Sequence, residues 1–148
     1  MIINYRVNQE KHKVKFCSQN NKDFIVSDLK KLISDKKILF LYDKNIDELL
    51  IRQILDNLKL SGCKVFIMEL EGAKVNKNEK LLFKIIDILI KNNFTKKSVV
   101  ISCGGGVVGD VSALASSIYL RGLIYFHIPT TMTAIVDSCI GGKTGINY

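Results

Sequence analysis

The sequence lacks the features that mark membrane-spanning, secreted and zinc-ribbon proteins. No uncharged apolar run reaches the roughly 18 residues of a membrane span, because the longest candidate, residues 81–90, is interrupted by Lys84 and Asp87. The amino terminus has no charged start followed by an apolar stretch and a cleavage site, so we expect a cytoplasmic protein without a signal peptide. The four cysteines form no Cys-x-x-Cys pair. We expect reduced, mostly buried thiols, with one disulfide as the alternative.

Composition predicts a single folded domain. The chain has 148 residues and is 47% hydrophobic, which excludes disorder. Its 22 Lys plus Arg and 14 Asp plus Glu give a net charge of +8. The basic residues are scattered, and no run interleaves them with aromatic residues, so we expect no nucleic-acid partner. A solvated lysine-rich surface and a site for a small anionic ligand both fit this charge.

Buried strands alternate with amphipathic helices along most of the chain. We predict strands at 38–42, 63–70, 98–103 and 123–128, and helices from a cap at Asn45 or Asp47 to 60, from a cap at Asn78 to 92, and at 108–119. Short helices are predicted at 26–33 and after Thr131, and an antiparallel strand pair at 2–7 and 13–17 around a turn at 8–11. This order predicts an α/β fold with a mainly parallel sheet and flanking helices.

A glycine-rich loop follows the third predicted strand of this series. Gly104, Gly106 and Gly109 match the pattern G-x-G-x-x-G between a strand and a helix, where backbone without Cβ atoms can approach a pyrophosphate. The usual acidic partner about 20 residues later falls near Thr130, which is not acidic. Asp43, at the end of the first strand of the series, fits a ribose partner better. A tight structural turn is the alternative reading.

Several other polar residues interrupt small or apolar stretches. Lys143 follows two glycines, but Asp137 occupies the place of the first Walker glycine, so this is not a P-loop; the lysine can still contact phosphate. Thr130 and Thr131 close a strand and can contact a ligand or cap a helix. Asp137, Ser138 and Arg121 can contact ligands or form structural pairs. His12 and His127 have no acid at ligand spacing, so no metal site is predicted, and His127 is interpreted as a core histidine.

Taken together, four blocks resemble the 3-dehydroquinate synthase family of sugar-phosphate cyclases. They are residues 104–110, Arg121-Gly122, residues 129–131 and residues 136–147, in that order. The resemblance implies that residues 1–148 form a Rossmann-like NAD-binding domain. It also implies that the family's C-terminal helical domain, which holds zinc or cobalt through a Glu and two His, is absent from this chain.

The resemblance further implies individual roles. Catalytic roles fall on Lys143, Asp137 and Arg121, with Arg121 reaching the phosphate in the neighbouring subunit of a homodimer. The family's Gly-Glu-x-x-Lys loop departs here at Ala73 and Asn76, so Lys77 serves only if the loop is longer. The implied NAD contacts are Asp43, Lys77, Gly105, Gly106, Val107, Val108, Gly109, Asp110, Thr130, Thr131, Asp137, Ser138 and Lys143.

The activity implied by the resemblance is the cyclisation of a seven-carbon keto-sugar-acid phosphate in the shikimate pathway of aromatic amino acid biosynthesis. NAD-assisted transient oxidation, phosphate β-elimination, reduction and intramolecular aldol closure form the sequence of steps. We expect no turnover by this chain alone. The alternatives are a metal-dependent polyol dehydrogenase of the glycerol type, or a non-catalytic NAD-binding module or fragment.

Overall fold

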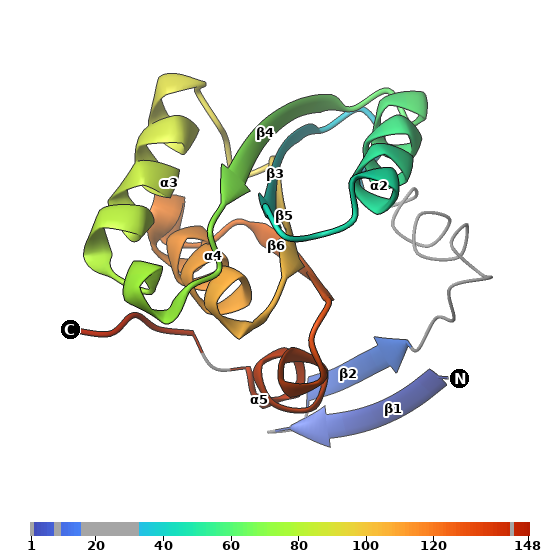
Figure 1. Cartoon of the computed structure of the whole chain (residues 1–148). Helices are drawn as coiled ribbons and strands as arrows, with labels where there is room; N and C mark the ends of the chain where they lie inside the picture. Colours follow the sequence, from blue (N-terminus) through green and yellow to red (C-terminus); the bar gives the residue numbers. More distant parts are fainter. Residues whose placement is uncertain (1, 8–9, 16–32, 143) are drawn as a thin grey trace. The chain divides into compact units, whose positions relative to one another are not determined.

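The computed structural model of the chain describes residues 2–7, 10–15, 33–142 and 144–148. Two units are distinguished, Met1–Leu32 and Ile33–Tyr148. In the first unit, β1 (Ile2–Val7) and β2 (Glu10–Lys15) pair antiparallel (Figure 1). The second strand begins at Glu10 rather than at the predicted Lys13, because charged side chains do not prevent backbone pairing. The predicted helix at 26–33 lies outside the described residues except for Ile33, and so does Cys17.

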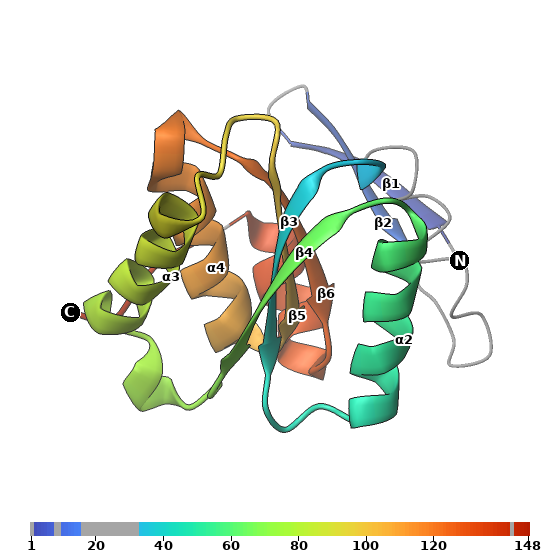
Figure 2. The same cartoon turned by 90° about the horizontal axis from the view of Figure 1, so that it is seen from above.

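The second unit is built on four parallel strands in the order β4-β3-β5-β6. Helix α2 lies on one face of this sheet, and α3 and α4 lie on the other (Figure 2). The mainly parallel α/β fold predicted from the sequence is therefore confirmed. The bounds are β3 (Lys37–Asp43), α2 (Glu48–Leu60), β4 (Lys64–Leu70), α3 (Glu79–Lys91), β5 (Val99–Gly104), α4 (Gly106–Ile118) and β6 (Ile124–Pro129).

The hydrophobic core lies on both faces of the two central strands. All six residues of β5 are buried, as expected for a strand covered by helices on both sides. Helix α3 buries Leu82, Ile85 and Leu89, as its 3.6-residue periodicity predicts. Leu81 and Ile86 of the same helix pack at the margin of the cluster. Burial of these apolar faces fixes the register of the sheet.

Two predicted capping residues begin the outer helices. The side chain of Asp47 accepts a hydrogen bond from the Leu49 amide at 2.7 Å, so it caps α2 in preference to Asn45. The side chain of Asn78 accepts from the Leu81 amide at 3.1 Å and donates to the Val75 carbonyl at 2.7 Å. Each cap satisfies an amide that the helix itself leaves unpaired.

The boundaries near the glycine loop differ from the prediction. Helix α4 begins at Gly106, not at Val108, so the loop itself forms the first helical turn. The strand predicted to end at residue 128 also includes Pro129, because β6 is an edge strand, where the missing amide hydrogen of proline is tolerated. The Thr130 amide then donates to the Gly104 carbonyl at 3.0 Å. The helix predicted after Thr131 is a π-helix, η4 (Ala134–Ser138), followed by α5 (Cys139–Gly141).

The described residues contain three unpaired cysteines: Cys63, Cys103 and Cys139. Cys103 is fully buried, and the other two are half-buried. No helix in the described residues is long and apolar enough to cross a bilayer.

Asn78→Ala should lower the free energy of unfolding by about 1 kcal/mol, because the Leu81 amide loses its cap. Chemical denaturation of the two proteins measures the difference. Lys80→Ala, an exposed change in the first turn of the same helix, is the control and should stay within about 0.5 kcal/mol of the unchanged protein. Equal stabilities for the two variants would contradict the capping role.

Candidate functional site

At the carboxyl edge of the sheet, the chain runs from neighbouring strands toward opposite faces of the sheet. Strand β3 ends at Asp43 and leads to α2 on one face, whereas β5 ends at Gly104 and leads to α4 on the other. In open α/β sheets, ligands bind outside the strand ends at such a point of divergence. Asp43 and the glycine loop, which the sequence singled out separately, therefore meet at the position that this fold favours for a ligand.

The amino end of α4 presents backbone amides at this edge. Gly105 is the N-cap and provides no side-chain cap. The Gly109 amide donates to the Gly105 carbonyl at 3.0 Å, which closes the first turn. The amides of Gly106, Val107 and Val108 precede that bond and have no acceptor within the helix. Together with the partial positive charge of the helix terminus, they suit an anion such as a pyrophosphate.

Two residues that follow β6 in the chain lie beside this turn. A Cβ atom at Gly105 would lie 3.2 Å from Thr131 Cγ2, and one at Gly106 would lie 3.9 Å from Ser138 Oγ. Thr131 Oγ1 accepts from the Ala134 amide at 3.2 Å, so the helix-capping alternative holds for this threonine. The structure therefore brings Thr131 and Ser138 to the glycine loop. Thr130 follows β6 directly and is exposed.

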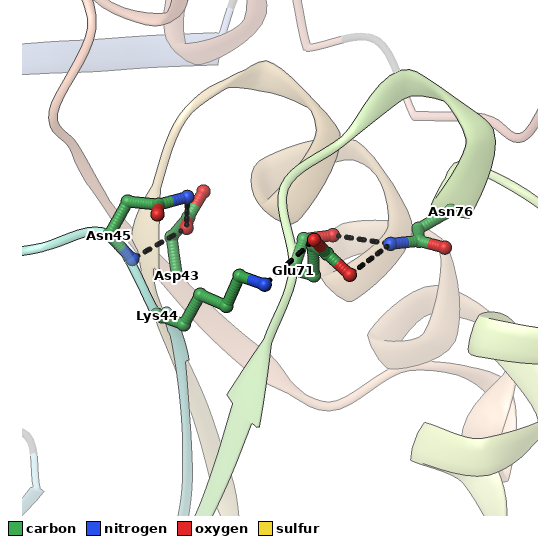
Figure 3. Close-up of polar contacts among 5 residues, drawn as sticks. All are labelled: Asp43, Lys44, Asn45, Glu71 and Asn76. Atoms are coloured by element: carbon green, nitrogen blue, oxygen red, sulfur yellow. Dashed lines mark hydrogen bonds and ion pairs between the residues drawn. The ribbon is translucent and has the colours of Figure 1, made fainter.

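The carboxylate of Asp43 is held by its own loop (Figure 3). Its Oδ1 accepts from the backbone amide and from the side-chain amide of Asn45, both at 3.0 Å. Its Oδ2 faces Gly72, where any Cβ atom would collide with it, and that position is also 3.6 Å from Val108 Cγ2. Burial, with the Asp43 charge as a smaller cause, raises the pKa of the Cys103 thiol to about 12. Asp43 is thus oriented from one side and keeps one oxygen for a ligand.

A second polar cluster on this edge was missed by the sequence analysis (Figure 3). Lys44 pairs with Glu71 at 2.7 Å, and the Asn76 side-chain amide donates to the Glu71 carbonyl at 3.1 Å. The ion pair raises the pKa of Lys44 and lowers that of Glu71. Both groups are exposed, so this pair adds little stability. Charged residues directly after adjacent strands were the signal in the sequence.

Lys77 and Asp110 were both predicted as cofactor contacts, and the structure pairs them with each other. Lys77 Nζ lies 2.5 Å from Asp110 Oδ2, and both side chains are mostly shielded from solvent. The pair ties the loop before α3 to the first turns of α4. The Lys77 carbonyl also accepts from the Asn147 amide at 2.7 Å, which fixes the segment after Thr144 against the same loop.

One of the three predicted catalytic residues lies away from this edge. Arg121 precedes β6, at the opposite edge of the sheet, in a turn where it and Leu120 both have positive φ (64° and 50°). Non-glycine residues rarely adopt that conformation. Asp137 lies in η4 and is exposed. Lys143 lies outside the described residues.

The third glycine of the motif is explained by packing rather than by a ligand. A Cβ atom at Gly109 would lie 2.8 Å from His127 Nε2, closer than real contacts allow. The interpretation of His127 as a core histidine is thereby supported: Nδ1 lies 2.7 Å from the buried Ser102 Oγ. Burial lowers the pKa of His127, opposed by hydrogen bonding to Ser102 and by Asp110.

Within the part of the chain that the structure describes, no three His, Cys, Asp or Glu side chains come together in a way that suits a metal ion. A zinc or cobalt site therefore does not fit these residues, and no chemical step is assigned to a metal here.

Comparison with known proteins identifies a matching family and several similar proteins. The sequence profile "3-dehydroquinate synthase N-terminal" matches residues 67–148. The 3-dehydroquinate synthase of Sulfurimonas denitrificans is 36% identical over 128 residues, covering 86% of this chain and 36% of that protein. The corresponding protein of Pelagibacter ubique is 36% identical, covering 99% of this chain and 40% of that protein. The chain thus spans well under half the length of these relatives.

Among solved structures, 2-deoxy-scyllo-inosose synthase complexed with carbaglucose-6-phosphate, NAD+ and Co2+ superposes with a TM-score of 0.83 at 16% identity, covering all of this chain and 40% of that one. A likeness at this identity shows the fold alone. The strand order and layers described above are therefore shared with the matched part of that structure.

Gly109→Ala should lower the free energy of unfolding by about 1–3 kcal/mol through overpacking against the imidazole. In a His127→Ala background the same change should become neutral or stabilising, because the ring is gone and alanine favours helix. Chemical denaturation of the four proteins measures this coupling. Gly106→Ala, whose Cβ meets nothing closer than Ser138 Oγ at 3.9 Å, is the matched control and should be tolerated. Additive effects of the two changes would exclude the contact.

Stability should fall as pH is lowered through the titration of His127. The unfolded chain protonates this residue near its ordinary pKa of 6.5, whereas burial delays protonation of the folded chain to lower pH. The unfolded state therefore binds more protons in that window, and the free energy of unfolding decreases there. Denaturation at about pH 7.5 and about pH 5.5 spans the ordinary pKa of histidine. His127→Gln should reduce the difference between them, while His12→Gln should leave the part due to His127 in place.

Proposed function

This chain belongs to the 3-dehydroquinate synthase family, and on that premise we propose that it binds NAD at the carboxyl ends of β3 and β5, as the cofactor-binding part of a sugar-phosphate cyclase. The observation that carries the proposal is the pairing of one oriented carboxylate with one uncapped helix terminus. Asp43 is held by Asn45 with its Oδ2 directed at Gly72. The first turn of α4 begins at the end of the adjacent strand β5.

These two features match the ribose and the pyrophosphate of an adenosine diphosphate group. A carboxylate after a strand accepts hydrogen bonds from ribose hydroxyls, and it repels the 2′-phosphate of NADP. Backbone amides at a helix terminus bind the pyrophosphate without a Cβ atom in the way. Gly72 and Gly105 supply the necessary space, since a Cβ atom at either would meet Asp43 or Thr131. The residues present therefore fit the cofactor.

The proposed reaction is the one implied by the family: conversion of a seven-carbon keto-sugar-acid phosphate to 3-dehydroquinate in the shikimate pathway. When bound, NAD supplies reversible hydride transfer at a secondary alcohol of the substrate. The chain's own part is positioning. Thr130, Thr131 and Ser138 border the nicotinamide side, Asp137 accepts from hydroxyl groups, and Lys143 contacts the substrate phosphate.

We further propose that the assembly is a homodimer in which Arg121 serves the neighbouring subunit. Its place at the amino edge of the sheet supports this, because Asp43 and the glycine loop lie at the carboxyl edge. The turn that carries Arg121 holds two non-glycine residues in the left-handed region. Such strain persists where the surrounding structure fixes it, often at functional positions.

Calorimetric titration of the 148-residue chain with NAD and with NADP tests the proposal. NAD should bind more tightly than NADP. Asp43→Asn should weaken NAD binding by roughly tenfold, the effect of one hydrogen bond to a charged group, and should reduce the preference over NADP. Gly72→Ala should weaken binding as well, because its Cβ displaces the carboxylate.

Asp47→Asn is the matched control. It removes the same charge at the same edge of the sheet and keeps a side chain that can cap α2, so it should leave NAD affinity unchanged. Equal affinities for Asp43→Asn and Asp47→Asn would exclude the ribose role of Asp43. Phosphate release from the sugar-acid substrate by the chain alone would contradict our expectation that it does not turn over by itself.

A further inference from the structure

Three polar side chains of β5 and β6 form a hydrogen-bonded chain beneath the first turns of α4. Ser102 Oγ is fully buried and lies 2.6 Å from the Tyr125 hydroxyl and 2.7 Å from His127 Nδ1. The Tyr125 hydroxyl lies 2.9 Å from the Gly109 carbonyl oxygen. The proposed cofactor contacts include none of these three side chains.

The number of available hydrogens determines which group donates in each of these hydrogen bonds. A carbonyl oxygen only accepts, so the single hydroxyl hydrogen of Tyr125 is donated to Gly109. Ser102 must then donate its own hydrogen to the Tyr125 oxygen. No hydrogen of Ser102 is left for His127, so His127 Nδ1 is the donor to Ser102.

With Nδ1 as the donor, the ring is either the Nδ1–H tautomer or the imidazolium, and the surroundings of Nε2 favour the neutral tautomer. A neutral ring that donates from Nδ1 carries a bare lone pair on Nε2. Nε2 is buried and has no hydrogen-bond partner among the described residues, and it faces the Cα of Gly109. Burial also lowers the pKa of His127, which favours the neutral ring. The charged and titratable neighbours are Asp110 of α4, itself paired with Lys77, and Cys139 of α5 near Tyr125.

Gly109 connects these hydrogen-bonded side chains to the glycine loop. Its carbonyl is held by Tyr125, its Cα rests on the imidazole, and its amide donates to the Gly105 carbonyl at 3.0 Å. A displacement of Gly109 therefore displaces Gly105, the first residue of the proposed pyrophosphate site.

We infer that His127, Ser102 and Tyr125 are positioning residues that hold the first turn of α4 in its ligand-binding geometry through hydrogen bonds running from His127 Nδ1 to the Gly109 carbonyl. The assignment of a ligand rests on the proposed function, whereas the donor and acceptor roles in these hydrogen bonds do not.

Nuclear magnetic resonance of the 15N-labelled chain tests these donor and acceptor roles. His127 should show a protonated Nδ1 and an unprotonated Nε2, the reverse of the tautomer that predominates in free histidine. Tyr125→Phe frees the Ser102 hydrogen to be donated to His127, so the population with hydrogen on Nε2 should rise. Tyr119→Phe is the control: Tyr119 also donates to a backbone carbonyl, that of Phe94 at 2.9 Å, but beyond the other end of α4. A protonated Nε2 in the unchanged protein would overturn the inference.

The same two variants test the positioning role. Amide exchange of Gly109 should be faster in Tyr125→Phe than in Tyr119→Phe, and NAD affinity should fall about fivefold in Tyr125→Phe alone, the effect of one ordinary hydrogen bond. Equal Gly109 exchange in the two variants would overturn the inference. If the unchanged chain binds no NAD, the proposed function fails, while tautomer and exchange still decide the role of these residues. Ser102→Ala, with Ser116→Ala as the buried-serine control, repeats the test should Tyr125→Phe unfold.

Discussion

The close approach of α4 to strands β5 and β6 is the constraint on which the rest of the structure depends. A Cβ atom at Gly104 would lie 2.8 Å from Val108 Cβ, and one at Gly109 would lie 2.8 Å from His127 Nε2, so both contacts require glycine. The helix then buries small and medium side chains, among them Val111 and Ala115. Because it begins at the end of β5, its first amides are presented beyond the sheet. The spacing of the glycines thus serves packing, and the exposed amides at the start of α4 are a consequence of it.

The architecture could be predicted from the sequence because short sequence patterns specify most of its strands and helices. Continuous apolar runs mark the buried strands, and Asp47 and Asn78 mark two helix starts. The failures are at boundaries where local chemistry permits more than one end. Pro129 is the last residue of β6 and does not lie after it, and α4 starts within the glycine loop. In both cases the boundary residue depends on long-range pairing or packing, which cannot be read from a single sequence.

Two parts of the candidate site could be predicted from the sequence, but the pairings between its residues could not. Asp43 and the glycine loop were recognised by residue type and position. The bond between Lys77 and Asp110 joins residues 33 positions apart and depends on how α3 packs on α4. Likewise, nothing in the sequence states that His127 and Tyr125 share Ser102, a residue of the neighbouring strand. Such partners follow from strand register, which is known only once the sheet is assembled.

The pairing of basic side chains at this edge bears on how the proposed site would attract an anion. Lys44 is bonded to Glu71 and Lys77 to Asp110, so neither contributes an uncompensated charge despite the net +8 of the chain. The amides at the start of α4 add a partial positive charge at the same edge, which acts within the first helical turn and is weakened by salt. An anion at the proposed site would therefore be selected by the shape of the loop and by backbone amides as well as by net charge.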